Sequence, residues 1–456
     1  MERLLLSEIA ACLGAGCPKE CEITEISTDT RTITQGSLFV AIKGDNFDGN
    51  EFVKKAIDQG AAAAVCERET EGCPCIVVED TRKAFLDIAR LYRKKFSPVL
   101  VGVTGSVGKT TTKEMTALVL SEKYKTLKTQ GNLNNGIGLP KTLLRLDSSY
   151  EAAVIEMGMN HFGEISSLTK TALPTMAVIT NIGYSHIENL GSREGILKAK
   201  LEILEGMEKD SPLITNGDND LLAPLKEKLD RPVLLYGIEN DKCDVRAENI
   251  REENGETFFT IRYDGSVYDM MIPCIGVHNV MNALCAFAVG VKSGLTPSEI
   301  ASALKKYQPE GMRQRIENRN GTDIIIDCYN ASPDSMKASL SVLSGMKVSG
   351  RRAAVLGDML ELGERSEELH RLVGKYVCEY KPDMLYCYGK EAGYIADEAE
   401  KGGIKAYAFG KDEKEELSDA LSKELKSEDA VLFKASRGMK LEEVIEKVFG
   451  KMIGGK

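Results

Sequence analysis

The segment VGVTGSVGKTTT, Val101 to Thr112, has the pattern of a buried strand followed by a tight turn and a helix. The helical pattern continues through KEMTALVLSEKY, residues 113–124. Backbone N–H groups at such a turn point at one anion, and the helix N-terminus favours negative charge. The usual phosphate-loop pattern G-x-x-x-x-G-K-[ST] needs a glycine where this chain has Val103. Gly105 and Gly108 still allow the turn, so we expect a shorter phosphate loop.

The residues after this turn suit a nucleotide. Lys109 supplies a mobile positive charge, and Thr110 or Thr111 offers a hydroxyl to Mg2+. The alternative is an ordinary strand-to-helix turn that contains GKT by chance. The order of strand, loop, lysine and helix favours the phosphate loop.

Two breaks divide the chain. A chain of 456 residues is too long for one ordinary core. The segment RKKFSP, residues 93–98, precedes the strand before the loop, and QPEGM, residues 308–312, marks a second break. We therefore predict an α/β protein of three domains: an N-terminal α/β domain (1–97), a central parallel-sheet domain with the phosphate loop (98–308) and a C-terminal Rossmann-like domain (309–456). Residues 257–271 alternate polar and apolar side chains, which predicts a peripheral antiparallel hairpin.

Composition and charge narrow the possible functions. The net charge of -10 argues against general binding to nucleic acid or to an anionic membrane. No apolar run approaches the length of a membrane span, and the N-terminus lacks the basic start and apolar core of a signal peptide. The twelve cysteines are scattered, which favours reduced thiols. We expect a cytoplasmic protein, as a monomer, that binds small anionic molecules.

Several polar residues follow apolar strands, where ligand-binding groups collect in open α/β sheets. Glu156 ends the strand AAVIE, and a magnesium ion that bridges phosphates needs such a carboxylate. His186 follows another strand, and Lys200 stands on the helix after it, where a solvated surface lysine is the ordinary interpretation. Glu164 is expected to start a helix.

Amide and carboxylate side chains farther along the chain suit the rest of a nucleotide. Asn279 and Asn282 lie three residues apart on one helix face. They could contact the edge of a base, or serve as a helix cap and a buried polar contact. Asp327 ends a strand and suits a ribose hydroxyl, and Asn330 and Ser332 lie in the loop that follows.

These motifs together resemble the Mur ligase family. GSVGKT, residues 105–110, fits that family's phosphate loop G-[TS]-x-G-K-[TS], and GVHNVMNA, residues 276–283, fits its adenine motif G-x-H-N-x-x-N-A. The resemblance implies that ATP is bound by Gly105, Ser106, Val107, Gly108, Lys109, Thr110, Thr111, Asn279, Asn282, Arg313 and Asp327. It also implies two Mg2+ ions, held by Thr110, Glu156, His186 and Lys200, with Lys200 carbamylated. The expected catalytic residues are Lys109, Glu156, His186 and Lys200.

The N-terminal segment STDTR, residues 27–31, resembles the uridine-diphosphate pocket of the family. The resemblance assigns Thr30, Arg31 and Asp48 to this substrate. Asn50 stands where the family usually has histidine, so the resemblance assigns no substrate contact to this position.

Three further segments resemble the branch that adds D-alanyl-D-alanine to UDP-N-acetylmuramoyl-tripeptide, a step of peptidoglycan precursor synthesis. They are GNLNNGIGLPKTLL (131–144), DCYNASPDSM (327–336) and GDMLELG (357–363). The resemblance implies that Asn134, Asn135, Asn330 and Ser332 contact these substrates. The implied reaction uses ATP to convert a carboxylate into an acyl phosphate, which the dipeptide amine then attacks. The alternatives are a diaminopimelate- or lysine-adding ligase, a folylpolyglutamate synthase, and a nucleotide-binding regulator without ligase activity.

Overall fold

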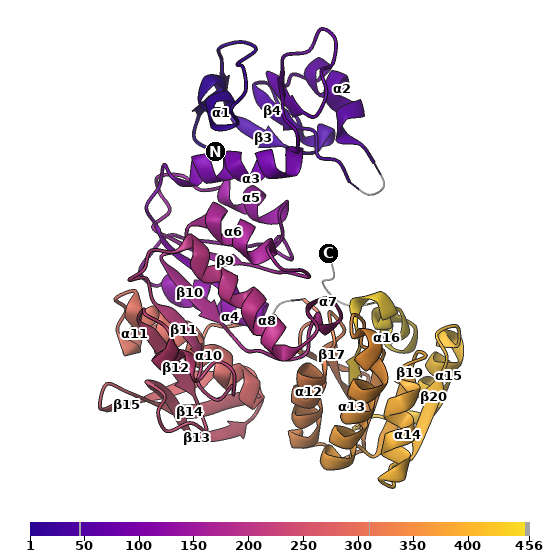
Figure 1. Cartoon of the computed structure of the whole chain (residues 1–456). Coiled ribbons are helices and arrows are strands. Elements are labelled where there is room, and N and C mark those ends of the chain that lie inside the picture. Colours follow the sequence, from indigo (N-terminus) through magenta and orange to yellow (C-terminus); the bar gives the residue numbers. More distant parts are fainter. Residues whose placement is uncertain (45–46, 310, 452–456) are drawn as a thin grey trace.

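The structure, a computed structural model, describes residues 1–44, 47–309 and 311–451. Its strands form three main sheets of four, nine and six strands and one small two-stranded sheet. Figure 1 shows the four-stranded sheet at the top, the nine-stranded sheet below it and the six-stranded sheet at the lower right. The predicted three-domain α/β architecture is confirmed, and we call these parts the N-terminal, central and C-terminal domains. The boundaries after residues 97 and 308 stay predictions.

The N-terminal domain is a parallel sheet covered by short helices. Its strands run in the order β3-β4-β5-β6, with β3 Glu25–Ser27, β4 Ser37–Val40, β5 Ala63–Cys66 and β6 Cys75–Val77. The helices are α1 Leu6–Cys12, α2 Val53–Asp58 and α3 Thr81–Arg93, and β1 Leu4–Leu5 pairs with β2 Glu22–Ile23.

Helix α3 joins this domain to the central one. It begins at a strong cap, because the Asp80 side chain accepts hydrogen bonds from the N–H groups of Arg82 and Lys83. Its far end packs against the central domain, where the Tyr92 hydroxyl donates to Leu146 O at 2.5 Å and Arg93 Nε donates to Ala172 O at 2.9 Å. Both side chains are buried, and Tyr92 belongs to a hydrophobic core that includes residues of both domains.

The central sheet has the order β15-β14-β13-β12-β11-β10-β7-β9-β8. Its strands are β7 Val99–Thr104, β8 Thr126–Lys128, β9 Ala152–Glu156, β10 Met176–Ile179, β11 Leu213–Asn216, β12 Val233–Gly237, β13 Val245–Glu253, β14 Glu256–Tyr263 and β15 Ser266–Ile272. Strands β7 to β12 pair in parallel, whereas β14 is antiparallel to both of its neighbours, β13 and β15. The expected antiparallel hairpin is thus confirmed, and β13 extends it to three strands.

The helices of the central domain cover both faces of the sheet. They are α4 Lys109–Leu120, α5 Gly138–Leu143, α6 Glu164–Ala172, α7 Ile187–Leu190, α8 Arg193–Leu201, α9 Leu225–Lys228, α10 Val277–Lys292 and α11 Pro297–Leu304. Helices α4 and α10 pack against each other beside the sheet and form a second apolar core. Among the described helices, none combines the length and the apolar character that a membrane crossing requires.

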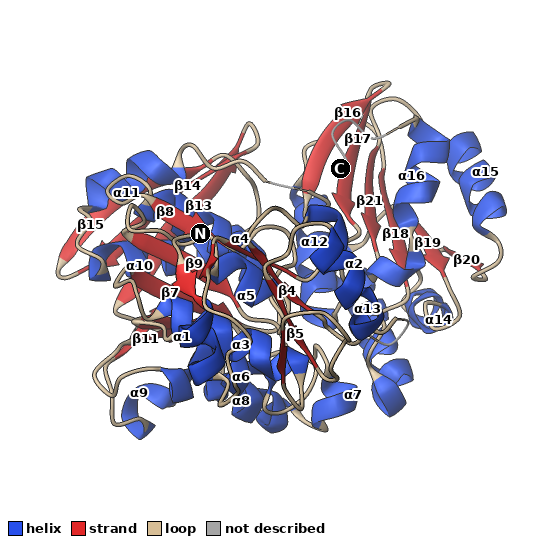
Figure 2. Ribbon diagram, turned by 90° about the horizontal axis from the view of Figure 1, so that it is seen from above, coloured by secondary structure: helices blue, strands red, loops and turns tan. Residues whose placement is uncertain are grey.

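The C-terminal domain is a smaller doubly wound sheet of order β16-β17-β21-β18-β19-β20. Figure 2 shows it set apart from the central strands. Its strands are β16 Arg315–Arg319, β17 Thr322–Asp327, β18 Arg352–Gly357, β19 Met384–Tyr388, β20 Ala406–Phe409 and β21 Ala430–Lys434. Its helices are α12 Pro333–Gly345, α13 Ser366–Tyr380, α14 Gly393–Lys401, α15 Lys414–Glu424 and α16 Leu441–Phe449. Among the described strands of this sheet, only the edge strand β16 is antiparallel to its neighbour.

The register of the central strands brings the loops after them to one edge. Val103 pairs with Glu156 on β9, and Thr104 pairs with Ile179 on β10. The carboxyl ends of three neighbouring parallel strands are therefore level. In open α/β sheets this edge is where ligands bind.

Candidate active site between the central and C-terminal domains

The loop between β7 and α4 requires glycine at two positions. Gly105 has a φ of 152°, and a Cβ there would lie 1.8 Å from Thr180 Oγ1. Gly108 has a φ of 81°, and its Cβ would lie 2.8 Å from Asn282 Oδ1. A side chain at either position would therefore strain the backbone and collide with a neighbour.

Asn181, which follows β10, shapes the same loop. Its backbone carbonyl accepts from Ser106 N–H at 3.1 Å, and its side-chain oxygen accepts from Val107 N–H at 2.8 Å. Helix α4 begins directly after Gly108 without a side-chain cap. The first N–H groups of a helix have no partner within it, so those of α4 can bind an anion. The sequence did not point to Asn181, because it lies 74 residues from Val107.

Lys109 is the cation of this loop. Its Nζ donates to Gly105 O at 2.8 Å and to Ser106 O at 3.3 Å. Burial lowers its pKa; nearby Glu156 opposes this shift, and Arg313 adds to it. The ammonium therefore lies at the loop, where it can neutralise a phosphate group.

Glu156 ends β9 beside the start of α4. Thr110 Oγ1 donates to Glu156 Oε2 at 2.9 Å, and Asn134 Nδ2 donates to Glu156 Oε1 at 2.8 Å. Lys113, also buried, has its Nζ 4.0 Å from Glu156 Oε2. A hydroxyl and a carboxylate oxygen in contact are the hard ligands that Mg2+ prefers, so this pair fits a magnesium ion that also binds phosphate oxygens. The structure thus brings together Thr110 and Glu156, two of the four predicted metal ligands.

The other two predicted metal ligands have different surroundings. His186 Nδ1 lies 2.6 Å from Glu361 Oε2 of the C-terminal domain. Lys200 on α8 is 1% exposed, and burial, followed by repulsion from Lys109, lowers its pKa well below the usual lysine value. Within residues 1–44, 47–309 and 311–451, no three His, Cys, Asp or Glu side chains are grouped as a ready metal centre.

A cavity of about 550 Å³ lies between the central and C-terminal domains. It gathers most of the predicted site residues, namely Ser106, Val107, Gly108, Lys109, Thr111, Asn134, Asn135, Glu156, His186, Asn279, Asn282, Arg313, Asp327, Asn330 and Ser332. Three predicted site residues of the central domain are outside this lining: Gly105 in the phosphate loop, Thr110 in the first turn of α4, and the buried Lys200, whose charge is affected by Lys109. Glu164, which also lines the cavity, begins α6 as expected.

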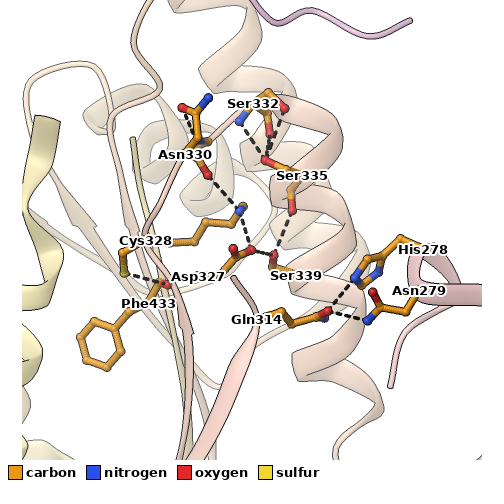
Figure 3. A network of polar contacts seen from close by, with 12 residues as sticks. His278, Asn279, Gln314, Asp327, Cys328, Asn330, Ser332, Ser335, Ser339 and Phe433 are labelled. Carbon is orange, nitrogen blue, oxygen red and sulfur yellow. Dashed lines mark hydrogen bonds and ion pairs between the residues drawn. The ribbon is translucent and has the colours of Figure 1, made fainter. Parts of the chain in front are cut away.

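Both asparagines of α10 line the cavity, and one of them, Asn279, contacts the C-terminal domain (Figure 3). Asn279 Nδ2 donates to Ile275 O and to Gln314 Oε1, both at 2.8 Å. Asn282 Oδ1 accepts from Thr112 Oγ1 at 3.0 Å, which ties it to α4. The sequence left two roles open for this pair, contact with a base or a buried polar contact. The structure is compatible with both, because the amides make buried polar contacts and also line the cavity. Gln314 was missed because nothing in its local sequence marks it.

Asp327, at the end of β17, is held by an ion pair. Lys434 Nζ at the end of β21 lies 2.6 Å from Asp327 Oδ2, and Ser339 Oγ donates to the same oxygen at 2.6 Å. Burial opposes ionisation of Asp327, but Lys434 and Ser339 outweigh it and lower the pKa. Lys434 Nζ also donates to Asn330 O at 3.3 Å, so one ammonium joins the strand end to the loop beyond it (Figure 3).

The residues predicted to bind uridine diphosphate lie in the N-terminal domain, outside the cavity lining. Arg31 forms an ion pair with Asp29, with Nη2 2.6 Å from Oδ2. Asn50 donates through its backbone and side-chain N–H groups to Asp48 Oδ1, and its oxygen accepts from Glu67 N–H at 2.8 Å. Asn50 is buried, and its hydrogen bonds hold Asp48 in place.

Comparison with known proteins shows that three segments of the chain match models of the same family. The matching family models are described as "Mur ligase family, catalytic domain" at residues 22–92, "Mur ligase middle domain" at residues 103–290 and "Mur ligase, glutamate ligase domain" at residues 313–437.

Two similar proteins carry the name "UDP-N-acetylmuramoyl-tripeptide--D-alanyl-D-alanine ligase". The one from Bacillus subtilis is 42% identical over 92% of both chains, and the one from Escherichia coli is 36% identical over 92% of both chains. Among solved structures, MurF from Acinetobacter baumannii matches with a TM-score of 0.91 and 30% identity, over 99% of this chain and 100% of that one. MurF ligase from Thermotoga maritima in complex with ADP matches with a TM-score of 0.84 and 30% identity, over 93% and 96% of the two chains.

Proposed function

Since this chain belongs to the Mur ligase family, we propose that it is an ATP-dependent ligase that joins D-alanyl-D-alanine to UDP-N-acetylmuramoyl-tripeptide. The observation that carries the proposal is the shared cavity: its lining combines the phosphate loop and Glu156, which Thr110 contacts, with residues 329–332 of the C-terminal domain. The resemblance in sequence, the names of the relatives and the geometry of the cavity all favour the same activity, this ATP-dependent ligation.

The first step needs two anions to meet. An oxygen of the tripeptide carboxylate attacks the γ-phosphorus of ATP, the bond to ADP breaks, and an acyl phosphate forms. Lys109 and the N–H groups at the start of α4 neutralise and align the phosphates, which is the main task in phosphoryl transfer. Mg2+ bound by Thr110 and Glu156 would supply further positive charge to the phosphate oxygens. Asn134 holds Glu156 in place.

The second step is attack by an amine. The dipeptide nitrogen attacks the acyl carbon, a tetrahedral intermediate forms, and phosphate leaves with the former carboxylate oxygen while the nitrogen loses a proton. The C-terminal domain supplies Asn330 and Ser332 to the cavity. A cavity enclosed by two domains limits the access of water, which would otherwise hydrolyse the acyl phosphate.

We assign the remaining contacts by the same reasoning. Asn279 and Asn282 line the end of the cavity that suits adenine, and Asp327 suits the ribose. Thr30, Arg31 and Asp48 are proposed to bind the uridine diphosphate, with Asn50 as support for Asp48 instead of a ligand. Location in the cytoplasm, where ATP is available, and a monomeric state stay predictions.

A carbamate on Lys200 and a second Mg2+ belong to the proposal as well. Carbamylation requires a neutral amine, because the nitrogen lone pair attacks carbon dioxide and a proton then leaves. Burial and Lys109 favour the neutral form of Lys200, and no hydrogen-bond partner of its Nζ is found in the described parts of the chain. The carbamate would provide oxygen ligands, together with His186, for the second ion.

The function is tested by phosphate release from ATP and Mg2+. Release that requires both UDP-N-acetylmuramoyl-tripeptide and D-alanyl-D-alanine supports the ligase. Release with UDP-N-acetylmuramoyl-L-alanyl-D-glutamate and diaminopimelate or lysine, in place of the tripeptide and the dipeptide, would indicate a diaminopimelate- or lysine-adding ligase. Release with folate and glutamate would indicate a folylpolyglutamate synthase. Nucleotide binding without release under any of these conditions would indicate a regulator and overturn the proposal.

A further inference from the structure

The guanidinium of Arg313 lies on the face of an aromatic ring. Its central carbon is 4.0 Å from the centroid of the Tyr329 ring, the shortest such distance between a cation and a ring in the described residues. Both residues line the cavity between the domains, and both are half-buried. At this distance the two planar groups are in van der Waals contact, so the attraction of the ring for the cation is near its strongest.

The ring leaves the hydrogen-bonding capacity of Arg313 free. A guanidinium carries five N–H groups in its plane, and a ring on its face blocks none of them. No acceptor contacts this guanidinium in the described parts of the chain. Arg313 therefore contacts the ring while its N–H donors have no protein acceptor, and it lines the cavity in which a ligand could accept from them.

The positive charges around Arg313 suit a polyanion. Without that polyanion they repel each other, so another group has to hold the Arg313 side chain in place. Lys109 lines the same cavity and is close enough for the two cations to repel each other. Such a pair is stable beside the phosphates of ATP. Before phosphate binds, repulsion would turn a long, flexible side chain away, unless another group holds it.

Tyr329 is itself fixed by the strand end before it. Asp327 is bound to Lys434, and the Cys328 thiol donates to Phe433 O at 3.3 Å, so two successive residues join β17 to β21 (Figure 3). Lys434 also holds Asn330 O on the other side of Tyr329. The ring therefore projects from a backbone that is anchored before and after it.

We propose that Tyr329 is a positioning residue that holds Arg313 in readiness for the ATP phosphates. This inference rests on the proposed role of Arg313 in ATP binding. Arg313 and Tyr329 both belong to the C-terminal domain, whereas the phosphate loop belongs to the central domain. The C-terminal domain thus contributes a preoriented arginine to a phosphate site built on its neighbour, as an arginine finger does within one chain.

The test compares two substitutions of similar size. Tyr329→Phe keeps the ring face, whereas Tyr329→Leu removes it. We expect Tyr329→Leu to weaken binding of a non-hydrolysable ATP analogue about tenfold, within the range of about 2- to 30-fold that a cation–π contact gives, and Tyr329→Phe to stay within about twofold of the wild type. Phe258→Leu is the matched control, because it removes the peripheral contact of Arg251, 4.7 Å from the Phe258 ring, and should change nothing.

A double-mutant cycle with Arg313→Ala then asks whether Tyr329 acts through the arginine. If it does, Tyr329→Leu has no further effect in the Arg313→Ala background. Multiplicative effects of the two substitutions, or equal losses in Tyr329→Phe and Tyr329→Leu, would overturn the inference. So would a raised KM for the dipeptide with unchanged nucleotide binding, since the ring would then contact the acceptor. Because analogue binding needs no turnover, these results remain readable even if the chain lacks ligase activity.

Discussion

Lys109 shows what one side chain contributes at the scale of a residue. Its position after Gly108 was predictable from the sequence, since the phosphate loop is a local pattern. Its burial and its contacts with the carbonyls of Gly105 and Ser106 place the charge where phosphate would bind. No other lysine of this loop can substitute for it.

We expect Lys109→Ala to reduce ligase turnover by at least about 100-fold, because it removes a charge that stabilises the transferring phosphoryl group. Phosphate release under saturating substrates measures the effect. Lys401→Ala, which removes an exposed lysine paired with Glu398, is the control. A rate for Lys109→Ala within tenfold of the wild type would refute the assignment.

Lys200 is the residue whose sequence context is least informative, and its neighbour Lys198 provides a comparison. Both lie on α8, but Lys198 is exposed and Lys200 is buried. Lys200→Ala should be nearly inactive and should regain activity with added short-chain carboxylates, which replace the oxygen ligands of a carbamate. Lys198→Ala should remain active.

A direct measurement complements this rescue. With 13C-labelled bicarbonate, the wild type should give a carbamate carbon signal in its NMR spectrum that Lys200→Ala lacks. Full activity of Lys200→Ala without added carboxylate, or the same signal in both proteins, would exclude Lys200 as the carbamylated ligand.

At the scale of an element, the turn between β7 and α4 depends on glycine for two separate reasons. Gly105 combines a positive φ with a near collision of a Cβ with Thr180, whereas Gly72 has a positive φ of 72° and open space around it. Gly105→Ala should therefore lose most nucleotide binding, and Gly72→Ala should lose only the modest stability that a positive φ costs an alanine, about 1 kcal/mol. Calorimetric titration with ADP and urea unfolding measure the two effects. Equal behaviour of both variants would contradict this explanation.

The loop of residues 357–363 depends on one histidine of α13. His370 is fully buried; its Nε2 accepts from Met359 N–H at 3.0 Å, and its Nδ1–H donates to Ser366 O at 2.8 Å. A backbone N–H can only donate and a carbonyl can only accept, so these contacts fix the neutral tautomer. Burial lowers the pKa of His370, although Ser366 O, Asp358 and Glu391 oppose the shift.

This gives a prediction for acid stability. Because the folded-state pKa lies below the unfolded value of about 6.5, the unfolded chain binds the proton first as the pH falls. The free energy of unfolding should therefore fall below about pH 6.5, by at most about 1.4 kcal/mol per pH unit from this group. His370→Gln should reduce that slope in urea unfolding between pH 7.5 and 5, and His161→Gln, at an exposed position, should leave it unchanged. An unchanged slope in His370→Gln would contradict the prediction.

At the scale of the whole molecule, helix α3 fixes the N-terminal domain to the central one. Arg93 is 5% exposed and donates to three carbonyls, those of Phe96, Ala172 and Leu173. Its truncation would leave these acceptors without a donor inside a buried interface. The interface positions the residues proposed to bind uridine diphosphate relative to the phosphate loop.

Arg93→Ala should lower the free energy of unfolding by about 2–4 kcal/mol. Arg90→Ala, on the exposed face of the same helix, should stay within about 0.5 kcal/mol of the wild type. Scanning calorimetry would also reveal whether the N-terminal domain unfolds separately once the contact is lost. A loss in Arg93→Ala no larger than that in Arg90→Ala would refute the role of this contact.

Some of this protein follows from the sequence by itself. Strand and helix periodicity, the two breaks and the glycines of the phosphate loop are local patterns, because the residues that define each pattern lie within a few positions of one another. The level ends of β7, β9 and β10 follow from parallel pairing, so Glu156 and the loop before His186 could be expected at one sheet edge.

Only the tertiary structure decided which distant residues meet. Asn181 supports the phosphate loop, Gln314 binds Asn279, and Lys434 holds Asp327, and each pair is separated by at least 35 positions. Burial likewise distinguishes Lys200 from Lys198, although they stand two positions apart. The physical reason is that hydrogen bonding and desolvation depend on what packs against a side chain in space, and chain folding sets that environment after the local elements have formed.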